Sequence, residues 1–319
     1  MSKRDKTNFP LLDHLDSIVE DLRNLVSSAV SGEDVEAVHD ARVATRRLKA
    51  ATVLVDEIVS SRYSKPFNRV GKCLRRQLGP LRDLDVMLEH LSEIKTPRHQ
   101  AAIQWLGVRF AEKRREAVQC AADNAPPVRM LARLGSWWGL RHEIQDSPDS
   151  IDDLLRQSVH LQLDAFVEQA DDLIGPRRND PHQLRIAGKS LRYTLEMARE
   201  HGIKLQASVV SLFKRMQSAL GLWHDYVVLA ERILRESVEC DLALHDPHLQ
   251  SELLNVAQLY LKKSDTQLKK MAALWKTRGE SLAQTIRQAF PLTQHLDEPE
   301  PVPEEEPAPA PEPKSAPAA

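Results

Sequence analysis

A histidine and three cationic residues recur at helical spacing near the N-terminal end of the chain. Offsets of three, four and three residues separate His39, Arg42, Arg46 and Lys49. In a helix that advances about 100° per residue, these four side chains fall within an arc of roughly 80°. Apolar residues of the same segment, such as Leu48, fall on the opposite side. The segment therefore predicts a helix with one packing face and one cationic stripe.

The same stripe recurs in the second half of the chain. The equivalent positions are His182, Arg185, Lys189 and Arg192, again opposite apolar residues. One such stripe is usually a solvated helix face. Two copies that keep both the stripe and the packing face indicate an internal duplication.

A second pair of segments agrees at nearly the same offset. The segment 70–83 matches 212–225, and both contain a leucine–glycine pair followed by an aspartate four residues after the glycine. The first copy belongs to a stripe of three cations, which are Arg69, Lys72 and Arg76. Only Lys72 has a basic counterpart, Lys214, so this stripe is poorer in the second half.

Stripes of this kind predict a site for a chain of phosphates. Cations held close together repel one another, and a polyanion placed between them relieves that repulsion. Arginine matches phosphate oxygens with two parallel hydrogen bonds, and lysine supplies a point charge. Histidine donates strongly once it is protonated, which we expect near neutral pH.

The elements that position the stripes are expected to be helices throughout. The 319 residues are 42% apolar with 5% aromatic residues and only 11 glycines, a composition typical of an all-α protein. Apolar periodicity and breaker residues predict helices over about 11–30, 33–60, 64–78, 98–123, 127–145, 154–173 and 247–290, and one that contains His182. Gly79-Pro80 is expected to end one helix, so that a short helix opens at Arg82 with Asp83 and Asp85 as caps.

Two further expectations concern the surface and the connection between the halves. Four cations of the helix 98–123 are expected to form a solvated face, and they are Arg109, Lys113, Arg114 and Arg115. Trp137 and Trp138 of the connecting helix are expected to pack the two halves together.

Charge and cysteine content favour a cytoplasmic protein with a basic body. The formal charge is −2, but seven acids and one base lie beyond residue 296, which leaves a body near +4. The three cysteines are scattered, with no CxxC pair, as expected for reduced thiols. We find no signal sequence and no apolar run of membrane length, so no membrane association is expected.

Three segments resemble the CHAD family, the conserved histidine α-helical domain. The segment His39–Leu48 resembles the family's first signature and His182–Tyr193 its second. Leu78–Asp85 resembles the family's Leu-Gly-x-x-Arg-Asp-x-Asp segment. The resemblance covers about residues 10–290. It implies two four-helix bundles related by pseudo-twofold symmetry, and non-enzymatic binding of inorganic polyphosphate in a basic central groove.

The resemblance also implies the domain limits and the site. The CHAD domain would span 10–290, with a first half over about 10–125, a connecting helix over 127–145 and a second half over about 149–290. The remainder, 291–319, is expected to be a disordered acidic tail of Pro, Glu and Ala. Carried over by position, polyphosphate contacts fall on His39, Arg42, Arg46, Lys49, Arg69, Lys72, Arg76, Arg82, His182, Arg185, Lys189, Arg192, Tyr193, Lys214 and His224. The protein would lie in the cytoplasm or on polyphosphate granules.

Three other functions stay open. A phosphohydrolase or phosphotransferase could use His39 or His182 as acid or acceptor, although no P-loop, GxSxG or Glu-x-Glu-x-Lys motif is present. Nucleic-acid binding is disfavoured because base-stacking aromatics are absent from the stripes, with only Tyr193 adjacent. The histidines could chelate a metal, but no clustered metal motif is found, so no metal or cofactor is predicted.

Overall fold

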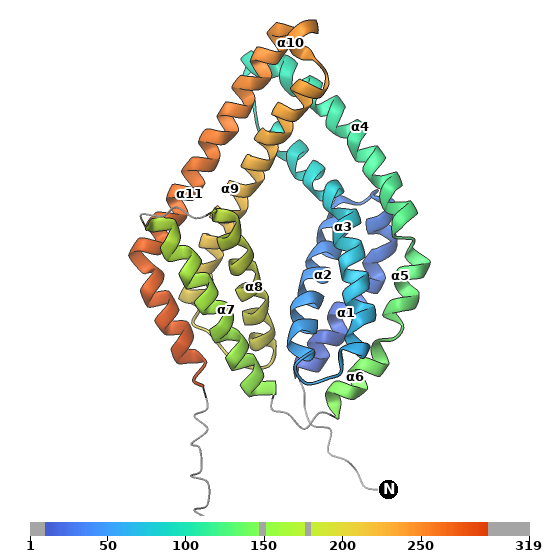
Figure 1. Ribbon diagram of the computed structural model, residues 1–319, viewed down its shortest axis with the longest axis vertical. Helices are drawn as coiled ribbons and strands as arrows, with labels where there is room; N and C mark the ends of the chain where they lie inside the picture. The colour runs from blue at the N-terminus through green and yellow to red at the C-terminus, as the bar shows by residue number, and fades with distance from the viewer. Residues whose placement is uncertain (1–9, 147–150, 176–179, 293–319) are drawn as a thin grey trace, which may run out of the picture.

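The computed structural model describes residues 10–146, 151–175 and 180–292, and every regular element in these ranges is a helix (Figure 1). The expected all-α class is therefore confirmed. Across the same ranges, no helix has the length and apolar character needed to cross a membrane. The predicted acidic tail lies outside the described residues, apart from its first two positions.

The first half consists of α1 (Pro10–Ser31), α2 (Val35–Val55), α3 (Ser61–Ser92) and α4 (Gln100–Asn124), with a 3₁₀ turn η1 (Pro97–His99) before α4. Two short helices, α5 (Pro127–Leu134) and α6 (Trp137–Gln145), follow it. The second half consists of α7 (Ile151–Ile174), α8 (Pro181–Glu200), α9 (Ala207–Glu239), α10 (Leu242–His245) and α11 (Pro247–Ala289). Aspartates cap both helices that carry a histidine stripe: Asp34 accepts from two amides of α2, and Asp180 accepts from the His182 amide.

The two halves repeat one arrangement of four helices. Each of α1 to α4 packs on the next and α4 returns to α1, and α7, α8, α9 and α11 pack in the same order. Equivalent contacts support the duplication: the Arg75 guanidinium donates to the carbonyl of Thr45, and the Gln217 amide donates to the carbonyl of Gly188. When the repeated segments of the two halves are aligned, Arg75 matches Gln217 and Thr45 matches Gly188.

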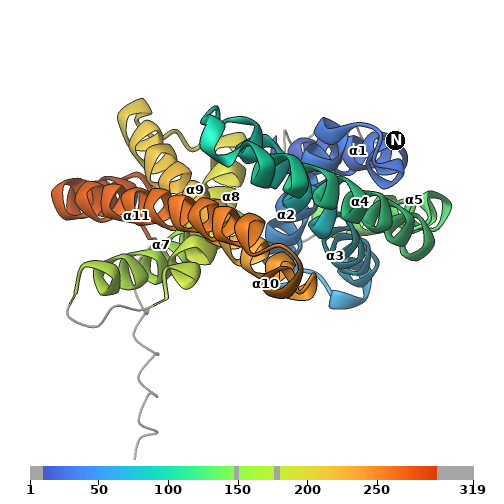
Figure 2. The same cartoon turned by 90° about the horizontal axis from the view of Figure 1, so that it is seen from above.

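Three hydrophobic cores hold the helices, and two of them include residues of both halves. The first lies mainly within α1, α2, α3, α5 and α6 and also takes in Ile151 and Leu155 of α7 and Met197 of α8, whereas the second lies within α7, α8, α9 and α11. The third joins α3 and α4 to α9 and α11 where the two arms meet at the top of Figure 1. Seen from above, α2 and α8 lie at the centre, between the other helices (Figure 2). The duplicated bundles are thus fused at one end.

The helix α3 runs without a break through Gly79 and Pro80, so the predicted break there was wrong. Asp83 and Asp85 lie within this helix and cap nothing. Two boundaries also differ from expectation, because α2 ends at Val55 and the connecting helix is divided into α5 and α6 at Gly135.

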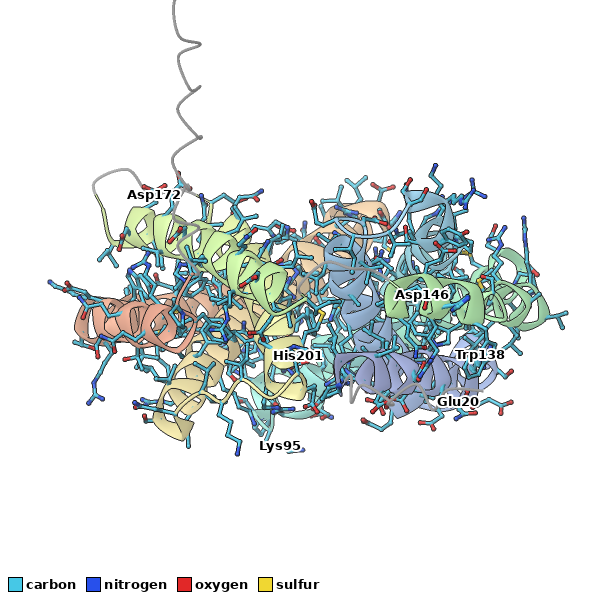
Figure 3. All side chains as sticks on the ribbon, turned by 90° about the horizontal axis from the view of Figure 1, so that it is seen from below. Glu20, Lys95, Trp138, Asp146, Asp172 and His201 are labelled. Atoms are coloured by element: carbon cyan, nitrogen blue, oxygen red, sulfur yellow. The ribbon has the colours of Figure 1, made fainter. Side chains whose placement is uncertain are left out.

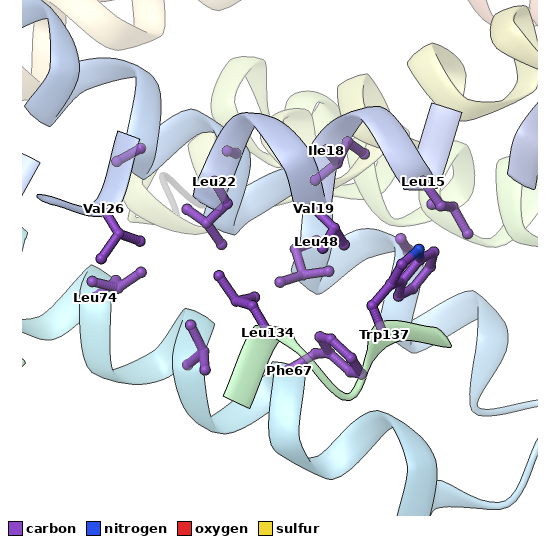
Figure 4. Close-up of a cluster of buried hydrophobic side chains, with 14 of the residues drawn as sticks. Leu15, Ile18, Val19, Leu22, Val26, Leu48, Phe67, Leu74, Leu134 and Trp137 are labelled. Carbon is purple, nitrogen blue, oxygen red and sulfur yellow. The ribbon is translucent and has the colours of Figure 1, made fainter. Parts of the chain in front are cut away.

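Only Trp137 lies in a core that includes residues of both halves, so the expectation for Trp138 was wrong. Trp137 lies in the first core against Phe67, with ring centroids 5.6 Å apart (Figure 4). Its indole N–H donates to Asp16 at 2.6 Å. Trp138 is 63% exposed on the first half, on the side away from the second half (Figure 3).

Ion pairs of α4 join it both to the second half, through Glu236, and to α3, through Asp85. The side chain of Glu236 on α9 is wholly buried, 3.4 Å from Arg109, 3.3 Å from Lys113 and 2.8 Å from Arg232. Arg114 binds the buried Asp85 of α3 at 2.6 Å. Of the four cations expected on a solvated face, only Arg115 is exposed. The sequence could not show this, because the acidic partners lie on other helices.

We expect Glu236→Gln to lower the free energy of unfolding by about 1.5–3 kcal/mol, because it removes the charge that accepts from three partly exposed cations. Urea denaturation measures this change. Glu239→Gln is the matched control on the same helix: its half-exposed side chain lies 3.6 Å from Lys113, and its loss should cost less than about 1 kcal/mol. Equal effects of the two variants would show that the buried Glu236 stabilises the fold no more than the half-exposed Glu239 does.

Candidate functional site

Four cations from the two halves form what we call the central cluster, which consists of Arg42 and Arg46 of α2 and Arg185 and Lys189 of α8. The charges act on one another across the boundary between the halves: Arg46 lowers the pKa of Lys189, and Arg185 lowers the pKa of Arg42. Both stripes therefore turn toward the same space, as α2 and α8 lie against each other at the centre of the fold (Figure 2).

Burial and repulsion leave this cluster poorly neutralised. Burial, followed by the charges of Arg46 and Arg185, lowers the pKa of Lys189 to about 7. Burial and the charge of Arg46 lower the pKa of Arg42 to about 10. The buried Nε atoms of Arg42 and Arg185 have no hydrogen-bond partner among the described residues. An anionic ligand would accept hydrogen bonds from these unpaired donors and would favour the charged forms of Arg42 and Lys189.

The Leu78-Gly79-Pro80 segment positions Arg42. The Nη1 of Arg42 donates to the Arg75 carbonyl of α3 at 3.1 Å. A Cβ at position 79 would lie 3.1 Å from that Nη1, so glycine leaves room for the guanidinium. The Arg75 guanidinium donates in return to the Thr45 carbonyl of α2 at 2.6 Å. These two bonds fix α2 against α3 and aim the first stripe at the second half.

Two carboxylates of equivalent position, Asp83 on α3 and Asp225 on α9, face the central cluster. Loss of hydration raises the pKa of both, and the cluster cations oppose that rise. Asp83 nevertheless keeps an exposed surface, as expected on a concave wall. Among the described residues, neither carboxylate has a cation close enough to form an ion pair. The cluster therefore keeps an excess of positive charge.

The histidines repeat the duplication. His39 lies near Arg82, while the His182 and His224 rings have centroids 5.4 Å apart. Position 224 of the second half is the equivalent of position 82 in the first. Burial and then Arg82 lower the pKa of His39, and burial and then Arg185 lower the pKa of His224 to about 4. The lowered pKa of His39 goes against the expectation that this histidine is protonated near neutral pH.

The structure divides the sequence-predicted residues into two sets. His39, Arg42, Arg46, Arg82, His182, Arg185, Lys189 and His224 gather at the centre. Lys49, Arg69, Lys72, Arg76, Arg192 and Lys214 are exposed residues outside the central cluster. Arg192 is already paired with Glu196 at 2.8 Å, and Tyr193 is 7% exposed, so its ring offers no platform for a ligand.

Sequence reasoning missed Arg75, Gln217 and the roles of the two aspartates. The sequence alignment of the two halves already matched Asp83 with Asp225, but it assigned these carboxylates no role at the site. A cavity of about 490 Å³ between α3, α4 and α9 is lined by Asp83 and by none of the four cations of the central cluster. No group of three or more potential metal ligands occurs within the described part of the chain.

Comparison with known proteins places this geometry in a family. The family model of the CHAD domain matches residues 13–234. The crystal structure of the CHAD domain from the plant Ricinus communis aligns with a TM-score of 0.58 at 24% identity, over 88% of this chain and 90% of that one. PptA from Streptomyces chartreusis aligns with a TM-score of 0.55 at 14% identity, over 83% and 99%. Both likenesses concern the fold alone. The curated protein sequences contain no match.

The pKa of Lys189 gives the empty protein a defined pH dependence. The pKa falls from 10.5 to about 7 on folding, so between these values the unfolded chain binds more protons. Stability should therefore rise with pH over this window, by on the order of a few kcal/mol. Urea denaturation between pH 7 and 9 checks this. Lys189→Met should flatten the rise, and parallel curves for parent and variant would contradict the assignment.

Proposed function

The chain belongs to the CHAD domain family, and on this premise we propose that it binds inorganic polyphosphate at the central cluster without converting it. One observation carries the proposal: four cations from two separate helices are held together with buried donors unpaired and only two carboxylates nearby among the described residues. Cytoplasm or polyphosphate granules are the locations that this function implies.

A linear phosphate chain matches the arrangement physically. Its closely spaced negative charges can meet Arg42, Arg46, Arg185 and Lys189 at once and relieve their repulsion. Arg46 and Lys189 are the best-suited contacts, because neither has a hydrogen-bonded partner among the described residues. Arg42 is partly engaged by the Arg75 carbonyl, and it can offer its remaining donors.

The geometry is less suited to nucleic acid. Binding of single strands usually relies on exposed aromatic rings as stacking platforms. Tyr193 is buried, and Trp223 is partly buried with its ring centroid 6.0 Å from that of His224. Competition between polyphosphate and RNA for the same protein separates the two ligands.

An enzyme acting on polyphosphate is the second candidate function. His39 and His182 would be its acids or acceptors, and each has a cationic or imidazole side chain as its neighbour. Either imidazole can donate an N–H to a phosphate oxygen, so the position of these histidines serves binding without any chemical step. Steady release of orthophosphate from polyphosphate, abolished by His39→Ala or His182→Ala, would favour the enzyme instead.

Removing two cluster charges should abolish most binding without unfolding the protein. Arg46→Gln with Lys189→Gln deletes two charged contacts, each worth about 1.5–3 kcal/mol. We expect the Kd for polyphosphate to rise by roughly two to four orders of magnitude. The melting temperature of the empty protein should rise, because repulsion is relieved. Calorimetric titration and thermal melts measure both effects.

The matched control removes two exposed charges from α11, with Lys262→Gln and Lys270→Gln. This variant should bind like the parent at moderate salt. If the cluster variant also binds like the parent, the site lies elsewhere.

Binding should strengthen as the pH falls from about 8.5 to 6.5. A bound polyanion raises the pKa of Lys189 above its value of about 7 in the empty site, so proton uptake accompanies binding. Lys189→Arg keeps its charge across this range and should flatten the dependence. The double variant His39→Asn with His182→Asn measures, in the same titrations, how much of the pH dependence of binding comes from the two histidines. A pH profile unaltered by Lys189→Arg would exclude Lys189 as the coupled group.

A further inference from the structure

We propose that a long polyanion leaves the central cluster along one side only, over five cations of α3 that we call the α3 track: Arg62, Lys65, Arg69, Lys72 and Arg76. This inference rests on the proposed function and extends it to a preference for long chains. The track makes the site one-sided, although the fold around it is duplicated.

The unbroken course of α3 makes the track continuous with the centre. Arg62, Arg69, Arg76 and Asp83 follow one another at intervals of seven residues. Seven residues are close to two turns, so such positions form a line with a drift of about 20° per interval. Asp83 at the upper end of this line faces the central cluster. From Arg62 to Arg76 the track extends about 21 Å at about 1.5 Å per residue.

The charges of the track are exposed and not neutralised. All five side chains are exposed. Residues 61–82 contain seven Lys or Arg and no Asp or Glu. In the described structure, no acid pairs with any of the five, and the partner seen is Tyr63, whose hydroxyl accepts from Arg62 at 2.7 Å. Like charges three and four residues apart destabilise a helix, so a solvated face normally mixes the two signs. A run of this kind is better explained by an anionic ligand.

The second half lacks an equivalent track. The positions that align with the five track residues are Lys204, Ala207, Ser211, Lys214 and Ser218. Of these five, only Lys214 supplies a cation within α9. On the neighbouring helix α8, Arg192 is bound to Glu196. A chain held at the centre therefore finds a line of cations beyond it on the α3 side and no such line on the α9 side.

Ligand length separates the track from the centre. Tripolyphosphate is short enough to occupy the central cluster alone, whereas long-chain polyphosphate extends beyond it. Each further phosphate neutralised should add about 0.7–0.9 to the slope of log K against log salt. The track should therefore raise both the affinity and the salt dependence for long chains, and neither for tripolyphosphate.

The test compares three proteins on the two ligands by calorimetric titration at low and high salt. A track variant replaces Arg62, Lys65, Arg69, Lys72 and Arg76 by Gln. It should bind tripolyphosphate within about twofold of the parent and lose roughly 10- to 100-fold for long-chain polyphosphate at low salt, with a shallower salt slope. The cluster variant, Arg46→Gln with Lys189→Gln, should lose both ligands.

A second variant tests the asymmetry by gain of function. Ser211→Arg with Ser218→Arg gives α9 the two arginines that α3 has at the equivalent positions. It should tighten binding of long chains several-fold and leave tripolyphosphate unchanged. Ser251→Arg with Ser281→Arg, at exposed positions of α11, is the control with equal added charge.

The possible outcomes distinguish a failure of the α3 track from a failure of the proposed binding at the central cluster. If the track variant binds long chains like the parent, or loses both ligands equally, the track is wrong while central binding stands. If the control arginines tighten long-chain binding as much as those on α9, added charge alone explains the gain and the track is again overturned. If the cluster variant keeps both ligands, the proposed function itself fails.

Discussion

The mutual repulsion of four cations at the α2–α8 contact is the constraint on which the rest of this structure depends. After burial, the charges of Arg46 and Arg185 lower the pKa of both Arg42 and Lys189, and such charges would drive the two halves apart. The fold opposes this from both sides. Above the cluster, the shared hydrophobic core and the buried Glu236 hold the arms together. Below it, Arg47 of α2 binds Glu196 of α8 at 3.1 Å, and Met197 packs into the first core. The four central cations thus lie between two contacts of the halves, each of which combines apolar packing with an ion pair.

Duplication explains how such a centre can be built, and divergence explains its asymmetry. One helix pair, repeated, supplies a stripe from each side, and the Arg75–Thr45 and Gln217–Gly188 contacts show that the two copies still pack alike. Glutamine at 217 keeps the contact to α8 and gives up a charge. Serines at 211 and 218 give up two more on the outer face. The copies have therefore kept the contacts that pack the helices, while the charge around the site has become concentrated in the first half.

The sequence predicted what depends on local periodicity. The stripes, their packing faces and the last long helix all follow from the spacing of residues along one helix. The sequence did not predict the features that depend on packing or on a partner residue of another helix. Proline at 80 removes one helical hydrogen bond, yet α3 continues, because apolar residues on both sides of it, such as Leu78 and Leu81, are fully buried. Arg114 looked solvated because its partner Asp85 lies on another helix. The central site was predicted as a list of cations, and its two carboxylates came from the structure.

The charges at the centre also change what the histidines can contribute. Burial and the surrounding cations that suppress protonation of Lys189 also lower the pKa of His39 and His224, so both imidazoles take up a proton less readily than a free histidine. A neutral imidazole still donates one N–H to a phosphate oxygen and costs less to keep beside arginines than an imidazolium would. Lys189, with a pKa of about 7, is then a group whose charge would respond to a ligand near neutral pH. An arriving polyanion would complete the charge of its own site, and the empty protein avoids part of the repulsion that a permanently charged centre would impose.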